Sequence, residues 1–250
     1  MDISFARARS RAPCRTDWQG LPGRGLGGLM SAITTDRGMP SYAIDLGAGQ
    51  DGKVEGMGIP AAGTKCLHTS WLESIALGSQ SKLREPAGVN QIEGTLANPL
   101  DVDLMDAILI YRNWFYRLPT RLTPGQSVEI TFDMIPKDVP RWLNRRGSVN
   151  GSEQVTRWNP SDRQSPDRLM EMLLFYRAAG GSAYVSLQHR FQPQVDFSKL
   201  INLDRAVLVG RLEEPLGELR INGSEQVGVA RELQQTWCRV VIPVAQTNRR

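Results

Sequence analysis

The sequence predicts a mainly β protein, an Ig-like antiparallel β-sandwich with one α-helical insertion at about residues 165–180. Two stretches support this prediction because every second residue in them is apolar, as a half-buried strand requires. One runs from Leu100 to Leu104 with aspartates between the apolar residues, and the other runs from Val128 to Phe132. Short alternating segments separated by turn residues are typical of sandwiches and barrels.

Further strands are predicted between the turn residues of the chain. They are expected at residues 65–72, 91–97, 107–112, 183–188, 206–212, 218–221 and 236–244. Pro124-Gly125 suits a type II turn, because proline fixes the first central φ and glycine accepts the positive second one. We therefore expect residues 114–118 and 126–133 to form one hairpin around this turn.

The helix is predicted from its ends and its apolar stripe. Ser165 suits an N-cap, Pro166 suits the first helical position, and Gly180 follows the last turn. Apolar residues recur at i, i+3, i+4 and i+7 from Leu169, so one face of the helix should cover a side or end of the sandwich. The preceding residues 140–164 are polar, and we expect them to form an exposed insertion.

The positive charge of the chain lies at its ends. The 250 residues carry a net charge of +4, of which residues 1–40 contribute +3 and Arg249 and Arg250 a further +2. Residues 1–40 mix arginine, glycine and proline without an apolar period, so they are expected to be a disordered basic tail before a β-sandwich domain at residues 41–250. A nucleic-acid interface needs basic residues on a folded face, so no nucleic-acid partner is expected.

The hexapeptide NGSEQV occurs twice, at residues 150–155 and 222–227. The flanking residues differ, so the two copies do not indicate a structural repeat. Asparagine and glycine both tolerate positive φ, and we expect each copy to be an Asn-Gly hairpin turn.

A glycine motif precedes the predicted strands. Gly47, Gly49 and Gly52 have the G-x-G-x-x-G spacing of dinucleotide and methyl-donor sites. Such a site requires a helix directly after the glycines, so that its free N–H groups meet the ligand. The following residues 53–63 are rich in glycine and proline and do not predict that helix, so no cofactor is expected.

The residues that carry most enzyme and metal chemistry are sparse. His68 and His189 have no metal-ligand spacing with each other or with cysteine, and no catalytic or metal-binding residue is assigned. Cys66 and Cys238 fall in the first and last clear strands, so a disulfide between them is one hypothesis. Two buried free thiols are the alternative.

Aromatic residues are the remaining candidates for binding. Trp142 and Trp158 lie in the polar insertion, where exposed aromatic side chains often mark contact patches. Phe115 lies on the strand face opposite to Trp114 and Tyr116. Trp142, Trp158 and Phe115 are therefore the candidate partner-binding residues.

Two segments, EGTLANPLDVDLMDAILIYRNWFYRLPTRLTPGQSVEI and LDRAVLVGRLEEPLGELRING, carry a family resemblance. With the terminal TWCRVVIPV they resemble the C-terminal, extracytoplasmic β-sandwich region of uncharacterised bacterial membrane-associated proteins. The motif residues are Gly94, Leu96, Asn98, Leu100, Leu104, Asp106, Leu109, Tyr111, Tyr116, Leu118, Leu122, Pro124 and Gly125. The resemblance implies a fold and an extracytoplasmic location, and it transfers no active site.

The sequence therefore indicates a non-catalytic binding or scaffolding module of the bacterial cell envelope. The expected partner is a protein or an envelope component. An enzyme that acts on envelope sugars or peptides is the alternative. No apolar run approaches the roughly 18 residues that cross a bilayer, so membrane association would need an anchor segment upstream of this chain.

Overall fold

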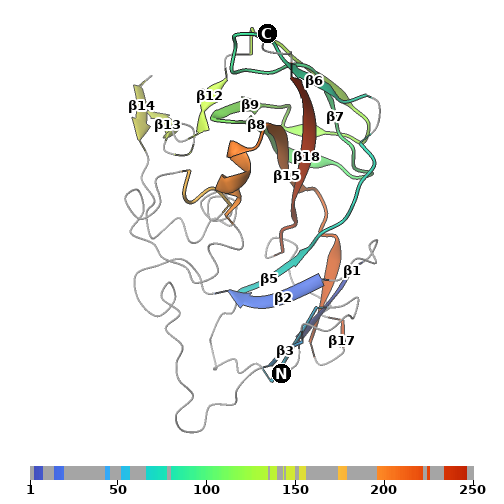
Figure 1. Cartoon of the computed structure of the whole chain (residues 1–250). Coiled ribbons are helices and arrows are strands. Elements are labelled where there is room, and N and C mark those ends of the chain that lie inside the picture. The colour runs from blue at the N-terminus through green and yellow to red at the C-terminus, as the bar shows by residue number, and fades with distance from the viewer. Residues whose placement is uncertain are drawn as a thin grey trace. The chain divides into compact units, whose positions relative to one another are not determined.

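The computed structural model describes residues 3–7, 14–19, 43–45, 52–56, 66–77, 80–134, 136–139, 143, 145–149, 152–155, 174–178, 196–221, 224–225 and 234–246. These residues are mainly β with little helix (Figure 1), which confirms the predicted class. The chain divides into two units. Unit 1 contains Met1–Ser74, Ser186–Phe191 and Pro215–Gln234, and unit 2 contains Ile75–Val185, Gln192–Glu214 and Gln235–Arg250.

Unit 1 contains two antiparallel sheets. The five-stranded sheet has the order β17, β16, β1, β4, β3, and β2 and β5 form a separate pair. The strands are β1 (Ile3–Arg7), β2 (Cys14–Gln19), β3 (Ala43–Asp45), β4 (Gly52–Glu55), β5 (Cys66–Trp71), β16 (Gly217–Ile221) and β17 (Ser224–Glu225). The sheet therefore joins the N-terminal part of the chain to residues more than 200 positions later.

The structure differs from the expected disordered tail at two segments. Residues 3–7 pair with β16 and β4, and residues 14–19 pair with β5. The physical reason is long-range pairing, because a short strand whose partner lies far along the chain has too few residues to show a period of its own. The other residues of 1–40 lie outside the described ones, so the tail boundary remains a prediction.

Unit 2 is built on one curled, mixed sheet. In the described part of the chain its strand order is β11, β7, β6, β18, β15, β8, β9, β12, with β10 paired to β8. The strands are β6 (Lys82–Glu85), β7 (Glu93–Ala97), β8 (Leu104–Tyr111), β9 (Trp114–Arg117), β10 (Arg121–Leu122), β11 (Ser127–Ile130), β12 (Lys137–Asp138), β15 (Arg205–Leu212) and β18 (Trp237–Gln246). A hairpin of β13 (Arg145–Val149) and β14 (Ser152–Val155) and the 3₁₀ helix η3 (Phe197–Asn202) complete the described elements.

Strand β18 joins the two halves of this sheet. Its residues 237–243 pair antiparallel with β15, whereas Val244–Gln246 pair parallel with β6. Pro243 lies at the last antiparallel pair, where a residue without an N–H donor is tolerated because the ladder ends there. The parallel pair makes the sheet mixed, so the purely antiparallel pairing of the predicted sandwich is not found.

The central strands are covered on both faces. Ile110 and Phe115 pack with Val207 in a hydrophobic cluster that also contains Phe175 and Ile201. The alternate residues of the same strands, Leu109, Tyr116 and Leu208, are also buried. This explains the continuous apolar sequence of β15, because a strand buried on both faces has no polar side to alternate with.

Two sequence expectations for unit 2 are wrong. Residues 98–103 form no strand and the chain bends at residues 100–102, because the Asn98 amide donates to the carbonyls of Val102 and Leu122 and its oxygen accepts from the Leu100 N–H. Such side-chain bonds replace strand pairing. The Pro124-Gly125 turn itself is confirmed, with φ 69° at Gly125. It connects β10 to β11, and β11 pairs with β7 rather than with β9.

The predicted helix and polar insertion lie mostly outside the described residues. Of the helix, only residues 174–178 are described; Leu174 and Phe175 are buried, and Leu174 alone of the five has helical geometry. Within the insertion, Leu143 is buried in the same cluster, so the insertion is not exposed throughout. No helix in the described part of the chain has the length and hydropathy of a membrane span.

Candidate functional site

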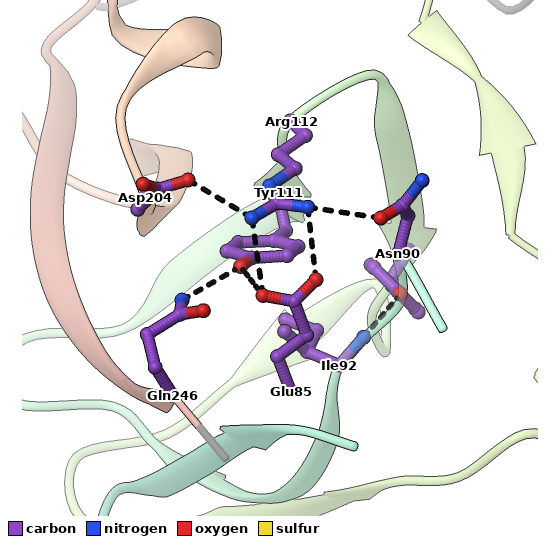
Figure 2. A network of polar contacts seen from close by, with 8 residues as sticks. Glu85, Asn90, Ile92, Tyr111, Arg112, Asp204 and Gln246 are labelled. Atoms are coloured by element: carbon purple, nitrogen blue, oxygen red, sulfur yellow. Dashed lines mark hydrogen bonds and ion pairs between the residues drawn. The ribbon is translucent and has the colours of Figure 1, made fainter. Parts of the chain in front are cut away.

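A network of polar side chains lies where β6, β8 and β18 end, and Arg112 is at its centre (Figure 2). Arg112 is the first residue of the two-residue turn between β8 and β9, since Tyr111 pairs with Trp114. Its φ is 50°, a left-handed value that is uncommon for a residue with a side chain. We call the group Glu85, Asn90, Tyr111, Arg112, Asp204 and Gln246 the Arg112 clamp.

The Arg112 guanidinium bonds to side chains at the end of β6, in the loop that follows β6 and in the loop before β15. Its Nη1 donates to Glu85 Oε1 at 2.8 Å and to Asn90 Oδ1 at 3.0 Å. Its Nη2 donates to Glu85 Oε2 at 3.1 Å and to Asp204 Oδ1 at 3.0 Å. The end of β6, the loop after it and the loop before β15 are therefore fixed by one side chain.

Glu85 is the buried partner in this network, with only 6% of its side chain exposed. Its carboxylate accepts from Tyr111 Oη at 2.8 Å in addition to the two bonds from Arg112. A buried carboxylate is costly unless it is paired and hydrogen-bonded, and here both oxygens have donors. Glu85 therefore acts as an anchor for the Arg112 turn.

Tyr111 connects the anchor to the C-terminal strand. Its hydroxyl accepts from Gln246 Nε2 at 3.1 Å, and Arg112 Cζ lies 5.2 Å from the centre of the Tyr111 ring. Burial raises the pKa of Tyr111, so the phenol stays protonated and continues to donate to Glu85. Burial lowers the pKa of Arg112, but the hydrogen bond to Asp204 and the neighbouring charges outweigh it and leave that pKa raised.

The clamp is suited to positioning rather than to catalysis. All four Nη hydrogens of Arg112 have acceptors, so they do not present an anion site. The Glu85 oxygens are likewise used, and no serine, cysteine or histidine belongs to the network. What remains exposed is the set of loops held by Arg112, residues 86–91, 112–113 and 202–204, which we call the loop surface.

A second group of charges lies on β8, β10 and β15 and on the residues directly before β8 and after β15. Arg121 pairs with Asp103 and Glu213, and Arg211 pairs with Asp106. Asp106 has a φ of 51° at a bulge, where β8 has one more residue than β15. These carboxylates are all ion-paired to arginines, so they resemble a surface ion-pair network more than an acid and base pair.

Of the three residues predicted to bind a partner, the structure describes only Phe115. Phe115 is 2% exposed and packs in the hydrophobic cluster, which corrects the prediction that it contacts a partner. The physical reason is that β9 is covered on both faces, so the face opposite to Tyr116 is also core. Trp142 and Trp158 lie outside the described residues.

The predicted disulfide remains a prediction. Cys238 has a free thiol in the structure, and burial raises its pKa to about 12. Cys66 is the first residue of β5 in unit 1, and its side chain lies outside the described ones. Across the described ranges, no group of three or more histidine, cysteine, aspartate or glutamate residues is placed to hold a metal ion.

The structure places strands beside both NGSEQV copies and beside the glycine motif. Val149 pairs with Ser152 and Ile221 with Ser224, so both NGSEQV copies lie at two-residue hairpins, as predicted. The glycine motif is flanked by β3 and β4, which pair antiparallel, and β4 begins at Gly52. A strand therefore follows the glycines where a dinucleotide site needs a helix.

The sequence did not point to the Arg112 clamp. Glu85 lies in the charged segment KLREP, which shows no sign of burial, and its partners are 26 or more positions away. The one available signal was the pair of apolar segments on either side of Arg112-Asn113, which is typical of a hairpin.

The chain matches no protein-family model, no curated protein and no solved structure.

Proposed function

We propose that this chain is a non-catalytic binding or scaffolding module of the bacterial cell envelope, and that it binds a protein or envelope component through the loop surface. The observation that carries the proposal is that the guanidinium of Arg112, in the turn between β8 and β9, bonds to side chains of two other loops, Asn90 and Asp204. Loops that are held in place lose little conformational freedom on binding, which favours affinity.

The loop surface also offers apolar contact area. Val89 is 36% exposed and Leu203 is 42% exposed. Each lies next to a residue that Arg112 holds, Asn90 in one loop and Asp204 in the other. Exposed aliphatic groups on fixed loops are typical of a contact site for a partner.

The proposal includes a fold class for the module. We propose an Ig-like arrangement because β18 passes from one half of the sheet to the other, as strands do at the corners of packed sheets. Binding loops grouped at one end of the strands are also typical of Ig-like domains. The extracytoplasmic location is supported by the resemblance of the two sequence segments alone.

Co-sedimentation with isolated bacterial envelopes tests the proposal. The wild-type chain should sediment with the envelopes, and the double variant Val89→Asp/Leu203→Asp should lose at least tenfold in apparent affinity because charge replaces the apolar contacts. Phe132→Asp is the matched control, since Phe132 is 48% exposed on a different loop. Equal sedimentation of all three proteins would overturn the loop surface as the binding site.

The alternative of an enzyme is tested on the same preparations. Release of soluble sugar or peptide fragments from the envelopes over time, dependent on active protein, would replace the binding proposal with an enzymatic one.

Export is tested separately by fractionating cells that produce the protein, and recovery in the cytoplasmic fraction alone would contradict the envelope location.

A further inference from the structure

One face of the C-terminal strand β18 is exposed beyond Trp237. Val240, Ile242 and Val244 are buried, whereas the alternate residues are exposed, namely Arg239, Val241, Pro243 and Ala245. The hydrophobic cluster described above includes Trp237, but among the described residues it includes none of these four. A strip of aliphatic side chains therefore lies at the surface of unit 2, with Arg239 at one end of it.

Positively charged side chains flank this strip on both neighbouring strands. Arg205 of β15 pairs with Pro243, so it lies directly beside the strip. On the other side, β6 pairs parallel with the end of β18, and its exposed residues Lys82 and Arg84 alternate with buried ones as those of β18 do. We call the group Lys82, Arg205, Arg239, Val241 and Pro243 the β18 face.

Most of the positive charge on these strands has no carboxylate beside it. The exposed face of β6, β15 and β18 carries arginines and a lysine but no aspartate or glutamate. Glu93 of β7 neutralises Arg84, and Asp106 of β8 neutralises Arg211. Within the part of the chain that the structure describes, no ion pair is formed by the remaining cations, which are Lys82, Arg205 and Arg239.

The carboxylates next to the β18 face do not alter this balance. Asp204 precedes Arg205 in the chain, but its carboxylate is bound to Arg112. Glu129 lies two strands away from Lys82, because both residues pair with Thr95 of β7 from opposite sides. The β18 face therefore has a net positive charge and favours an anionic partner.

Arg239 gives the second line of support. Its Cζ lies 4.3 Å from the centre of the Phe197 ring, and burial lowers the pKa of Arg239. At Arg112 the same effect of burial is outweighed by Asp204 and the neighbouring charges. A partly desolvated cation that no described carboxylate stabilises gains more from an incoming anion than a cation that is already paired.

The spacing of the cations indicates what kind of anion fits. Lys82 and Arg205 lie on opposite sides of β18, so their backbones are about 10 Å apart. Arg239 lies four residues along the strand from Pro243, about 14 Å away. A single phosphate or carboxylate cannot contact all of these cations, whereas an extended layer of anions can. The exposed Val241 and Pro243 between the cations suit a partner that also has an apolar layer.

We propose that the β18 face binds the surface of an anionic phospholipid bilayer, with its cations contacting headgroup phosphates and Val241 facing the acyl chains. Long basic side chains around an aliphatic centre are suited to this boundary, because their charged ends reach the headgroups while their stems stay in apolar surroundings. The intact bilayer is required, since one lipid phosphate cannot reach all of the cations. This inference goes beyond the proposed function, because the β18 face and the loop surface consist of different residues.

Co-sedimentation of the purified full chain with lipid vesicles tests the inference. The chain should bind vesicles of phosphatidylglycerol and phosphatidylcholine at least tenfold more tightly than vesicles of phosphatidylcholine alone. Binding should weaken as NaCl is added, because salt screens exposed charges. Lys82→Glu/Arg205→Glu should lose at least tenfold in affinity for the anionic vesicles while the thermal midpoint stays nearly unchanged, because both side chains are exposed.

The matched control changes the net charge by the same amount elsewhere on unit 2. Arg117 of β9 and Lys137 of β12 are also exposed, and Arg117→Glu/Lys137→Glu should stay within threefold of wild type. Equal binding to the two kinds of vesicle, or equal losses in the two double variants, would overturn the inference. Binding of soluble poly-glutamate without binding of anionic vesicles would replace the bilayer with an acidic protein partner. The vesicles contain no protein or glycan, so these outcomes bear on the β18 face and leave the loop surface to the envelope experiment.

Discussion

Replacing Arg112 with alanine should destabilise unit 2 strongly, because it leaves a buried carboxylate without its cation. Glu85 keeps the hydrogen bond from Tyr111 but loses both bonds from Arg112. Removing one partner of a fully buried ion pair costs about 3–5 kcal/mol. Arg112 is 26% exposed, which allows water to reach Glu85, so we expect the low end of that range, about 3 kcal/mol.

A double-mutant cycle separates the ion pair from other effects of the substitution. Alanine at residue 112 keeps the left-handed φ of 50°, so backbone strain is the same in both proteins. Glu85→Gln removes the buried charge, and Glu85→Gln/Arg112→Ala should lose about 2 kcal/mol less than the sum of the single variants.

The assay is urea denaturation followed by circular dichroism, together with hydrogen exchange of the β8 amides to assign the loss to unit 2. Arg121→Ala is the matched control, because Arg121 also pairs with two carboxylates, Asp103 and Glu213, but is itself 56% exposed. Its free energy of unfolding should stay close to that of wild type. If Arg112→Ala is as stable as Arg121→Ala, or if the cycle is additive, the clamp does not hold the loops as argued.

Three further predictions concern the sheet and its buried groups. Gly94→Ala should cost 3 kcal/mol or more, because Gly94 has a φ of 124° and an added Cβ would lie 2.0 Å from the Lys82 carbonyl oxygen. Gly88→Ala, with a φ of 79° and open space around it, should cost only about 1 kcal/mol in thermal or urea unfolding, and equal losses would contradict the close approach. Burial raises the pKa of Tyr116, so its contribution to stability is complete below pH 10 and is lost as pH rises through the folded value. Tyr116→Phe should flatten the fall of the thermal midpoint between pH 9 and pH 11, and an unchanged slope would show that another group is responsible. Burial raises the pKa of Cys238 from 9.0 to about 12, so in a chain without its other cysteines this thiol should react with Ellman's reagent at pH 8 only on unfolding, and fast reaction of the folded protein would show that it is accessible.

Local turn chemistry was predictable because it depends on residues that are neighbours in the chain. Both NGSEQV copies lie at two-residue hairpins, and Gly125 has the positive φ that a type II turn requires. The strand that β11 pairs with after the Gly125 turn was not predictable. β11 pairs with β7 across the sheet, and the sequence near the turn does not contain that information.

The alternating pattern at residues 100–104 predicts a strand that the structure does not contain at 100–103. Asn98 bonds to the backbone at three points and fixes this segment as bends, although its apolar residues alternate as in a strand. Periodicity records which residues are apolar, whereas a side chain that competes for backbone groups decides the local structure.

The candidate site was beyond sequence reasoning for a different reason. The clamp joins Glu85, Arg112, Asp204 and Gln246, which come together through the pairing of β6 with β18, of β18 with β15 and of β15 with β8. The candidate partner-binding residues were chosen because they are aromatic. Phe115 shows the weakness of that preference, because β9 is covered on both faces and Phe115 packs in the hydrophobic cluster.

The proposed binding site for partners is the set of loops that Arg112 holds. Hydrogen–deuterium exchange of the purified chain, measured by mass spectrometry with and without solubilised envelope material, tests it most directly. Added protection should be confined to residues 86–91, 112–113 and 202–204, and it should be lost in Val89→Asp/Leu203→Asp. Protection that falls on other segments, or none at saturating envelope material, would contradict it.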